Sequence, residues 1–329
     1  MASGPTILVT GAGGFVARGL VERMAAEPGL KGARLVLTDH RIGRVAAWPD
    51  AEIVEGDLRD ESLRARLCDD TVDICFHLAG VLGGAAEANY DLARAVNLDA
   101  GLSLLEDLRR PSRPPRVIFA SSIAVFGAPL PPRVDDETAP LPTMTYGAQK
   151  LMIETALGAF SRRGELDGVA LRLPGVVARP DADTRLKSAF LNRLFHDFAA
   201  GTDMILPVSP QGRTWLLSRT ACADNLLKAA MITPDRLGER RAITLPAVQC
   251  SMADLIDGLR RRYPHSPSRV RFEPDPWLDA QFAAYPPLAT PLAESLGFAA
   301  DEGVDRLIEH AIAAGAAPAI ATMTEEARG

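Results

Sequence analysis

Short apolar runs rich in β-branched residues alternate with longer stretches of helical composition through the first half of the chain. This alternation restricts the fold strongly, because each strand–helix–strand unit places its two strands parallel in one sheet. The central runs are almost wholly apolar, as expected for strands covered by helices on both faces. We therefore predict an α/β fold built on a doubly wound parallel sheet. The expected strands are 7–10, 35–38, 53–54, 72–77, 117–120 and 169–172, and the expected helices are 14–27, 60–69, 86–109 and 145–163.

The regular alternation ends near residue 173, where prolines begin to interrupt the chain. Helical stretches at 186–200, 218–232 and 301–314 predict a smaller, mostly helical C-terminal lobe that caps the carboxyl edge of the sheet. The run Ala242–Leu245 is expected to rejoin the main sheet as a late strand. The predicted division is a first domain over 1–173 with a returning segment near 218–250, a substrate lobe over 174–217 and 251–315, and a tail over 316–329.

A glycine-rich turn, Thr10-Gly-Ala-Gly-Gly-Phe-Val-Ala17, joins the first expected strand to the first expected helix. Gly11 suits the tight turn, and Gly14 lets the backbone approach a pyrophosphate at the positive end of the helix. Such turns are common, but the strand–turn–helix context favours a dinucleotide-binding Rossmann domain. The cofactor contacts expected from the turn are Gly11, Gly13, Gly14, Phe15 and Val16.

Asp39 ends the second expected strand, at the place where an acid binds the hydroxyls of the adenosine ribose. Its charge would repel a 2′-phosphate, so NAD is favoured, and NADP is the weaker alternative. Arg41 keeps that alternative open because it is able to reach such a phosphate. The other interpretation of Asp39 is a surface turn residue.

The ends of the third and fourth expected strands supply further cofactor contacts. Asp57 and Leu58 are expected to flank the adenine. Leu78, Ala79 and Gly80 follow the fourth strand, and the small residues in this run allow the chain to pass beside the cofactor. His77, at the end of the same strand, is interpreted as a structural residue.

Tyr146 and Lys150 lie four residues apart in an expected helix, so the phenol and the ammonium share one face. A tyrosine with the ordinary pKa of about 10 is a poor base at neutral pH. A nearby cation favours the phenolate and makes it a proton acceptor for a substrate hydroxyl. Ser121 and Ser122 end the fifth strand, where a hydroxyl is placed to bind the substrate oxygen. The alternative is that these serines only satisfy backbone groups of the loop.

Together these motifs resemble the extended short-chain dehydrogenase/reductase family, of the NAD-dependent epimerase/dehydratase type, over roughly residues 5–250. The resemblance implies that Ser122, rather than Ser121, acts with Tyr146 and Lys150 as the catalytic set. It further implies that Asn97 orders the active site, and that Pro174 and Val176 contact the nicotinamide. Ile123-Ala124 replaces the acid pair that sugar-nucleotide dehydratases of the family carry, so dehydration is not expected.

Two further stretches, Ala170–Pro180 and Pro207–Trp215, are similar to a subgroup of the family that oxidises the C2 hydroxyl of a four-carbon sugar acid to a 2-keto acid with NAD. Sugar-nucleotide epimerases usually carry Arg-Asp-Phe or Arg-Asp-Tyr where this chain has Arg213-Thr-Trp215. The departure argues against a nucleotide-sugar substrate. The alternatives are a nucleotide-sugar epimerase that retains its NAD and a non-catalytic cofactor-sensing protein.

A carboxylate substrate requires a cation in the substrate lobe, and a bidentate guanidinium suits it best. Arg179, Arg185 and Arg213 are the candidates, with Arg213 favoured because Trp215 and a glycine-containing turn surround it. Lys187 is a further basic residue of the same lobe, and Arg172 and Asn192 are weaker candidates. The alternative for each basic residue is a solvated surface charge.

Composition excludes several other classes of partner. The net charge of -6 gives no electrostatic reason to expect nucleic acid or an anionic membrane surface. No apolar run is long enough to span a bilayer, and the N-terminus lacks a signal-peptide pattern. The four cysteines and five histidines show no metal-ligand spacing, so we expect free thiols, no metal and a cytoplasmic location. By analogy with the family, the helices over 86–109 and 145–163 are expected to pair in a homodimer.

Overall fold

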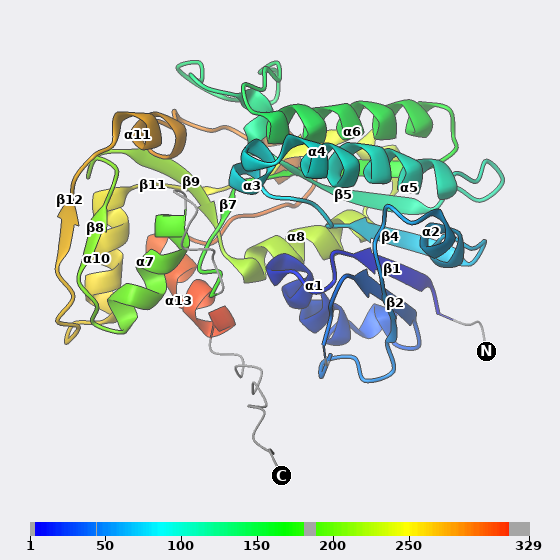
Figure 1. Cartoon of the computed structure of the whole chain (residues 1–329), viewed down its shortest axis with the longest axis horizontal. Coiled ribbons are helices and arrows are strands. Elements are labelled where there is room, and N and C mark those ends of the chain that lie inside the picture. Colours follow the sequence, from blue (N-terminus) through cyan, green and yellow to red (C-terminus); the bar gives the residue numbers. More distant parts are fainter. Residues whose placement is uncertain (1–3, 44, 181–188, 316–329) are drawn as a thin grey trace, which may run out of the picture.

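The computed structural model describes residues 4–43, 45–180 and 189–315, and its main element is a seven-stranded parallel sheet with the strand order β10-β6-β5-β4-β1-β2-β3 (Figure 1). The predicted doubly wound parallel sheet is confirmed. Its strands are β1 (Thr6–Thr10), β2 (Arg34–Asp39), β3 (Glu52–Glu55), β4 (Val72–His77), β5 (Arg116–Ser122), β6 (Asp167–Leu173) and β10 (Ala242–Thr244). The last strand, β10, pairs in parallel with β6, so the expected late strand does rejoin the sheet.

Helices cover both faces of this sheet (Figure 1). On one face, α1 (Phe15–Ala25) and α8 (Arg219–Met231) pack on the side chains of Ile7 and Val9. On the other face, α2 (Glu61–Leu67), α5 (Gly101–Asp107) and α6 (Thr145–Arg162) pack around Leu8. Because neighbouring residues of one strand point to opposite faces, burial on both sides explains why the central strands are apolar throughout.

The helix expected over 86–109 is interrupted. It consists of α3 (Gly83–Ala88), α4 (Tyr90–Ala93), a π-helical segment (Arg94–Ala100) and α5. The side chain of Asn89 accepts a hydrogen bond from the backbone N–H of Leu92 at 3.1 Å and so caps a new helix there. The helical composition was interpreted correctly, but the internal cap was overlooked.

Beyond the main sheet, the chain forms two small sheets that the sequence did not predict. They contain β7 (Gly175–Val176), β9 (Arg213–Leu217) and β11 (Val248–Ser251), and β8 (Met204–Leu206) with β12 (Val270–Phe272). The strands β7, β8 and β12 have only two or three residues, which is too short for a clear alternation of apolar and polar side chains.

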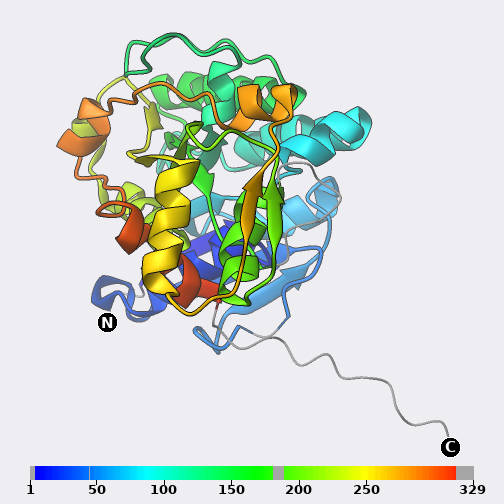
Figure 2. The ribbon, with the colours of Figure 1, turned by 90° about the vertical axis from the view of Figure 1, so that its left-hand side faces the viewer.

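Helices pack against these small sheets and enclose a separate apolar core that includes Phe195, Phe198 and Leu255 (Figure 2). They are α7 (Phe190–Ala199), α10 (Met252–Arg262), α11 (Pro276–Phe282) and α13 (Val304–Gly315), and the short helices α9 (Pro234–Leu237) and α12 (Pro291–Ser295) lie in the connections. We propose that this core marks the substrate lobe. Within the described residues, no helix is both long and apolar enough to cross a membrane.

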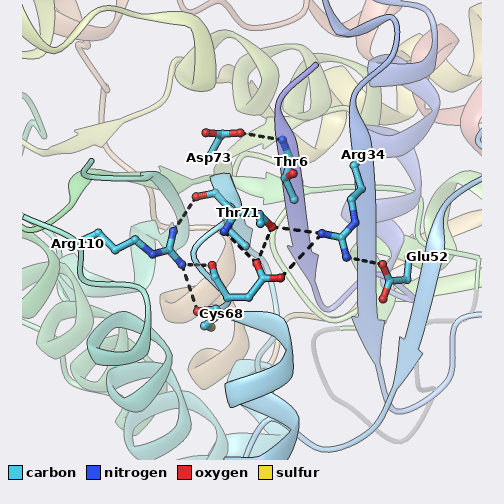
Figure 3. Close-up of polar contacts among 9 residues, drawn as sticks. Thr6, Arg34, Glu52, Cys68, Thr71, Asp73 and Arg110 are labelled. Atoms are coloured by element: carbon cyan, nitrogen blue, oxygen red, sulfur yellow. Dashed lines mark hydrogen bonds and ion pairs between the residues drawn. The ribbon is translucent and has the colours of Figure 1, made fainter. Parts of the chain in front are cut away.

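Polar contacts join the amino-terminal ends of the strands, as Figure 3 shows. Arg34, at the start of β2, donates to Glu52 at 2.7 Å and to Thr71 at 3.2 Å. The backbone N–H of Thr6 donates to Asp73 at 2.9 Å. Arg110 donates to the carbonyl of Val72 at 2.9 Å. These contacts fix the amino edge of the sheet, and the predicted site residues lie at the opposite, carboxyl edge.

Candidate active site

The glycine-rich turn lies between the carboxyl ends of β1, β2 and β4. Gly11 has a φ of +69°, and a Cβ at this position would lie 2.6 Å from the backbone nitrogen of Ala79. A Cβ on Gly13 would lie 2.3 Å from the carbonyl oxygen of Arg41. Larger residues are therefore excluded at both positions by backbone atoms.

The turn fits the pyrophosphate of a dinucleotide. Helix α1 begins at Phe15, and no side chain among the described residues caps its first turn, which leaves backbone N–H groups for a ligand. Two cations flank this helix start: the guanidinium groups of Arg219 and Arg179 lie 5.5 and 6.0 Å from the centre of the Phe15 ring. Gly13, Gly14, Phe15 and Val16 are the residues that would hold the phosphates.

Asp39 lies beside this turn at the end of β2. Its Oδ2 accepts a hydrogen bond from the backbone N–H of Gly13 at 3.0 Å, and its Oδ1 accepts one from His40 at 2.7 Å. The carboxylate is thus held next to the turn, where it would meet the adenosine ribose. The side chain of Arg41 is exposed two residues further on.

Asp57 and Leu58 follow β3, and the structure gives both of them local contacts. Asp57 pairs with Arg59 at 2.5 Å, and this ion pair lowers the pKa of the carboxyl group to about 2. Leu58 is half-buried and packs on the core between the sheet and α2. Contact with an adenine remains a prediction for both residues.

His77 ends β4 and is fully buried. Its Nδ1 lies 2.8 Å from Oγ1 of Thr10, and its ring stacks on Phe119 with 5.5 Å between the centroids. Burial lowers the pKa of His77 to about 3, and the charge of Lys150 acts in the same direction. The imidazole is therefore neutral at physiological pH, and its contacts serve packing within the sheet.

Asn97 connects the loop after β4 to α6. Its Oδ1 accepts a hydrogen bond from the backbone of Val81 at 2.7 Å, and its Nδ2 donates to the carbonyl of Val81 at 3.0 Å and to Oε1 of Gln149 at 2.9 Å. The same loop is held by Leu78, which donates to the carbonyl of Thr10 at 3.2 Å. A π-helical turn carries Asn97, as is frequent at functional sites.

Ser122, Tyr146 and Lys150 come together at the end of β5. Lys150 donates from Nζ to the carbonyl of Ala120 at 2.8 Å, and Nζ lies 5.5 Å from the centre of the Tyr146 ring. The hydroxyl of Ser122 lies near the Tyr146 phenol and acts to lower its pKa. The Oγ of Ser122 also accepts from the backbone N–H of Ala124 at 3.1 Å, which fixes its orientation.

The same burial acts in opposite directions on the two ionisable groups of this set. It raises the pKa of Tyr146 to about 12, against the charge of Arg179 and the hydroxyl of Ser122. It lowers the pKa of Lys150 to about 8, against the charge of Glu154. Burial disfavours whichever form carries the charge, so the phenol keeps its proton and the ammonium gives it up more easily.

A cavity of about 290 Å³ opens beside this set of residues. Ser122, Tyr146, Pro174 and Val176 line it, so the sequence-predicted catalytic and nicotinamide contacts share one space. The far wall belongs to the C-terminal lobe and includes Trp215, Gln281, Phe282 and Tyr285.

The candidate carboxylate-binding residues are placed unequally. Arg179 lines the cavity, and its backbone N–H donates to Oδ1 of Asn192 at 3.0 Å. The side chain of Arg213, the residue favoured from the sequence, is exposed outside the cavity, with Nη2 3.5 Å from the carbonyl of Gln249. Arg172 is paired with Glu154, and Arg185 and Lys187 lie outside the described residues.

Sequence reasoning missed four residues that bear on the site. Trp215 and Tyr285 form an aromatic wall, with 4.9 Å between their ring centroids, and Phe282 extends it. Nothing in the sequence joins Trp215 to residues some seventy positions later. Glu154 was detectable, because it repeats the four-residue spacing of Tyr146 and Lys150 on one helix face.

The profile of the NAD dependent epimerase/dehydratase family matches residues 7–219, which include the glycine-rich turn and the Ser122, Tyr146 and Lys150 set. This chain therefore belongs to that family. It is an enzyme of the dehydrogenase type that acts on CH–OH groups and uses a nicotinamide cofactor.

Two relatives cover almost the whole chain. The D-erythronate dehydrogenase of Cupriavidus necator is 35% identical over 312 residues, which are 92% of this chain and 96% of that protein. The D-erythronate dehydrogenase of Haemophilus influenzae is 29% identical over 310 residues, with 93% and 98% covered.

Solved structures show the same architecture. A nucleoside-diphosphate-sugar epimerase from Agrobacterium tumefaciens has a TM-score of 0.85 at 30% identity and covers 93% of each chain. An L-threonine dehydrogenase from Cupriavidus necator has a TM-score of 0.82 at 21% identity, over 94% of this chain and 99% of that one, and so shares the fold.

Proposed function

We propose that this protein oxidises the C2 hydroxyl of a small sugar acid, D-erythronate or a close relative, to the 2-keto acid with NAD. The observation that carries the proposal is the 35% identity to a D-erythronate dehydrogenase over 92% of this chain. The cavity volume of about 290 Å³ supports a small substrate, because pockets for small molecules typically measure about 300–1,000 Å³.

Tyr146 is the proposed general base, and Ser122 is the residue proposed to hold the substrate oxygen. Both side chains line the same cavity, and the Ser122 hydroxyl lies near the phenol, so a substrate hydroxyl that contacts Ser122 would also be within reach of Tyr146. The proton of the substrate hydroxyl passes to Oη of Tyr146. The bound cofactor supplies the hydride acceptor for the adjacent carbon and a positive charge.

Lys150 and Arg179 provide the positive charge of the protein near the phenol. The Lys150 ammonium lies 5.5 Å from the Tyr146 ring, and the Arg179 charge opposes the effect of burial on the Tyr146 pKa. Burial prevails over these effects, so the phenol is protonated at neutral pH. Tyr146 accepts a proton only as a phenolate, and the positive charge of a bound nicotinamide would favour that form.

Arg179 is the proposed carboxylate-binding residue, because it lines the cavity and Arg213 does not. Replacing Arg179 with Gln removes a charged bidentate contact, and such contacts contribute about 1.5–3 kcal/mol. We expect the KM for the sugar acid to rise at least about tenfold, and the Kd for NAD to rise by a smaller factor because Arg179 also lies beside the start of α1. Arg213→Gln is the matched control and should leave both constants unchanged. An equal effect of the two substitutions would refute the assignment.

The test of the proposed function is a screen of three- to six-carbon sugar acids and of UDP-sugars with NAD, followed by the absorbance of the reduced cofactor. Turnover of a four-carbon acid with net cofactor reduction is expected. The absence of reduction with every sugar acid in the screen would show that the substrate class is wrong.

One alternative is a nucleotide-sugar epimerase, which the structural similarity to the Agrobacterium tumefaciens protein favours. An epimerase regenerates its cofactor in each cycle, so it would interconvert UDP-sugars without net formation of reduced cofactor. The other alternative, a cofactor-sensing protein without catalysis, is disfavoured because Tyr146 and Lys150 are both present.

We also propose a cytoplasmic homodimer formed through the outer surface of α4 and α6. Tyr90 on α4 and Met152 on α6 expose 56% and 50% of their area, and a partner subunit would cover them. The mass measured by light scattering should be that of a dimer, and Met152→Lys should yield monomers. A monomeric wild-type protein would contradict this part of the proposal.

A further inference from the structure

A buried carboxylate lies directly behind the catalytic residues and has no part in the proton transfer. Glu154 follows Lys150 by one helical turn and Tyr146 by two on α6, and its side chain is only 3% exposed. A charge at such depth is costly unless partners offset the loss of water. Its partners therefore indicate what it does.

Glu154 joins α6 to the ends of two neighbouring strands. Its Oε1 accepts a hydrogen bond from Oγ of Ser121 at 2.5 Å, and its Oε2 pairs with Nη2 of Arg172 at 2.8 Å. Ser121 on β5 and Arg172 on β6 are direct partners in the sheet. The guanidinium of Arg172 also lies 5.1 Å from the centre of the Phe126 ring, in the turn after Ser122.

Ser121, the residue of β5 that binds Glu154, lies between two residues that contact the catalytic set. Ala120, the residue before Ser121, provides the carbonyl that receives the Lys150 ammonium at 2.8 Å. Ser122, the residue after it, lies near the Tyr146 phenol and lines the same cavity. A shift of α6 along the strand end would disturb both contacts, and the bond from Glu154 to Ser121 opposes that shift.

We propose that Glu154 is a positioning residue. Together with Ser121 and Arg172 it holds the face of α6 that carries Tyr146 and Lys150 against the end of β5 that carries Ser122. It also places a negative charge beside the Lys150 ammonium. The effect on catalysis rests on the proposed function. The placement of Lys150 and its protonation do not, and they are measurable without substrate.

The charge balance around Lys150 sets the direction of the expected effect. Glu154 is the negative group that raises the pKa of Lys150 against burial. Arg172 lies behind Glu154, Tyr146 carries a neutral phenol, and His77 on β4 is neutral. Glu154→Gln would leave the Lys150 ammonium facing only cations and neutral groups, so the pKa of Lys150 should fall further below its value of about 8.

The experiment is a ¹³C NMR titration of lysine Cε in the cofactor-free protein, combined with kcat and KM for the sugar acid. The other lysines are Lys31, Lys187 and Lys228, so the Lys150 signal is assignable with Lys150→Arg. In Glu154→Gln we expect the Lys150 midpoint to fall by about one pH unit or more. We expect kcat to fall at least about tenfold at neutral pH, with KM nearly unchanged, because alignment and not binding is lost.

Two further variants separate charge, alignment and general stability. Glu165→Gln removes an equally buried, paired carboxylate just beyond the far end of α6, and it should change neither the midpoint nor kcat. Ser121→Ala keeps the pair of Glu154 with Arg172, so it should lower kcat several-fold without moving the Lys150 midpoint. It also serves if Glu154→Gln fails to fold.

An unchanged Lys150 midpoint in Glu154→Gln, or an unchanged kcat in Ser121→Ala, would overturn the proposal. Equal losses in Glu154→Gln and Glu165→Gln would overturn it as well, because they would show a general effect on stability. If the wild-type protein oxidises no sugar acid but the Lys150 midpoint moves as expected, the proposed function fails and the placement of Lys150 by Glu154 stands.

Discussion

Tyr146 shows how a single residue depends on its surroundings for its chemistry. Burial raises the pKa of its phenol to about 12, which is the wrong direction for a base. The charge of Arg179 and the hydroxyl of Ser122 oppose that effect. The role of base that we propose for Tyr146 therefore depends on its neighbours and not on the tyrosine alone.

Replacing Tyr146 with Phe should lower kcat at least about a hundredfold, because general-base catalysis is typically worth a factor of about 10²–10⁴. The fold and the binding of NAD should be retained, since the ring remains. Formation of reduced cofactor measures turnover, and cofactor titration checks binding. Tyr263→Phe, in the C-terminal lobe, is the control. Retention of more than about a tenth of wild-type turnover would rule out the assigned role.

We propose that Asp39, a second single residue, determines cofactor preference. Asp39→Asn keeps one of the two acceptor oxygens that serve the backbone of Gly13 and His40, and it removes the charge that would repel a 2′-phosphate. We expect the ratio of kcat/KM for NAD to that for NADP to fall at least about tenfold, as for the loss of one charged hydrogen bond. A ratio that stays constant would mean that Asp39 does not contact the ribose.

The two serines at the end of β5 show where sequence reasoning reaches its limit for single residues. From the residues alone Ser121 and Ser122 were equivalent, and only the family resemblance favoured Ser122. In the structure Ser121 bonds to Glu154 behind the site, and Ser122 lines the cavity. Arg213, the residue favoured from the sequence, lies outside the cavity. Its place depends on how the short strand β9 packs in the small lobe, and the neighbouring sequence does not determine that packing.

Among the elements, the turn between β1 and α1 has the least freedom to vary. Its geometry depends on glycine twice over: the backbone of Gly11 is left-handed, and a Cβ would strike the backbone of Ala79. Gly164, in the loop after α6, has a φ of +70° but nothing within 4 Å of such a Cβ. The two positions therefore form a matched pair.

Gly164→Ala should cost about 1–2 kcal/mol of the free energy of unfolding, the ordinary penalty of a left-handed alanine. Gly11→Ala should cost more, and it should weaken NAD binding at least about tenfold because the turn must move away from β4. Urea unfolding and cofactor titration measure the two effects. Equal stabilities together with unchanged NAD binding would contradict the account of this turn.

The elements of the main sheet and the helices α7 and α13 of the small lobe were predictable, and the short strands of the small lobe were not. Strands such as β1 and β5 are long, apolar and buried on both faces, so their pattern is strong. The helix expected over 86–109 is interrupted where the side chain of Asn89 caps α4. The residues around Asn89 have helical composition, so the sequence pattern did not show this break. Strands such as β7, with two residues, exist only because a partner strand is already in place.

At the scale of the whole molecule, the buried His77 couples stability to pH. Burial lowers its pKa from 6.5 to about 3. Between these values the unfolded chain binds a proton that the folded protein does not, so the free energy of unfolding falls as the pH drops through this window. The contribution of His77 to the slope is about 1.4 kcal/mol per pH unit.

His77→Gln should remove this contribution. The free energy of unfolding should then fall less steeply as the pH drops, even if the variant is less stable overall. Urea unfolding from pH 7 to pH 4 provides the measurement. The exposed His265→Gln is the control and should keep the wild-type slope. The same slope in all three proteins would show that the imidazole is not held neutral in the folded state.

The cavity itself is a property of the whole chain. It is lined by residues from Leu82 to Tyr285, so both the main sheet and the C-terminal lobe contribute to it. The catalytic wall follows from motifs that lie close together in the sequence. The opposite wall, which we propose selects the substrate, requires packing between distant segments, and for that reason Phe282 and Tyr285 could not be predicted.

The most direct test of the central claim uses D-erythronate carrying deuterium at C2, oxidised with NAD, and mass spectrometry of both products. Oxidation at C2 transfers that hydrogen as hydride, so each reduced cofactor should carry one deuterium and the 2-keto acid should carry none at C2. Unlabelled reduced cofactor with deuterium retained in the acid, or no reduced cofactor at all, would contradict the proposal that this enzyme oxidises the C2 hydroxyl of a small sugar acid.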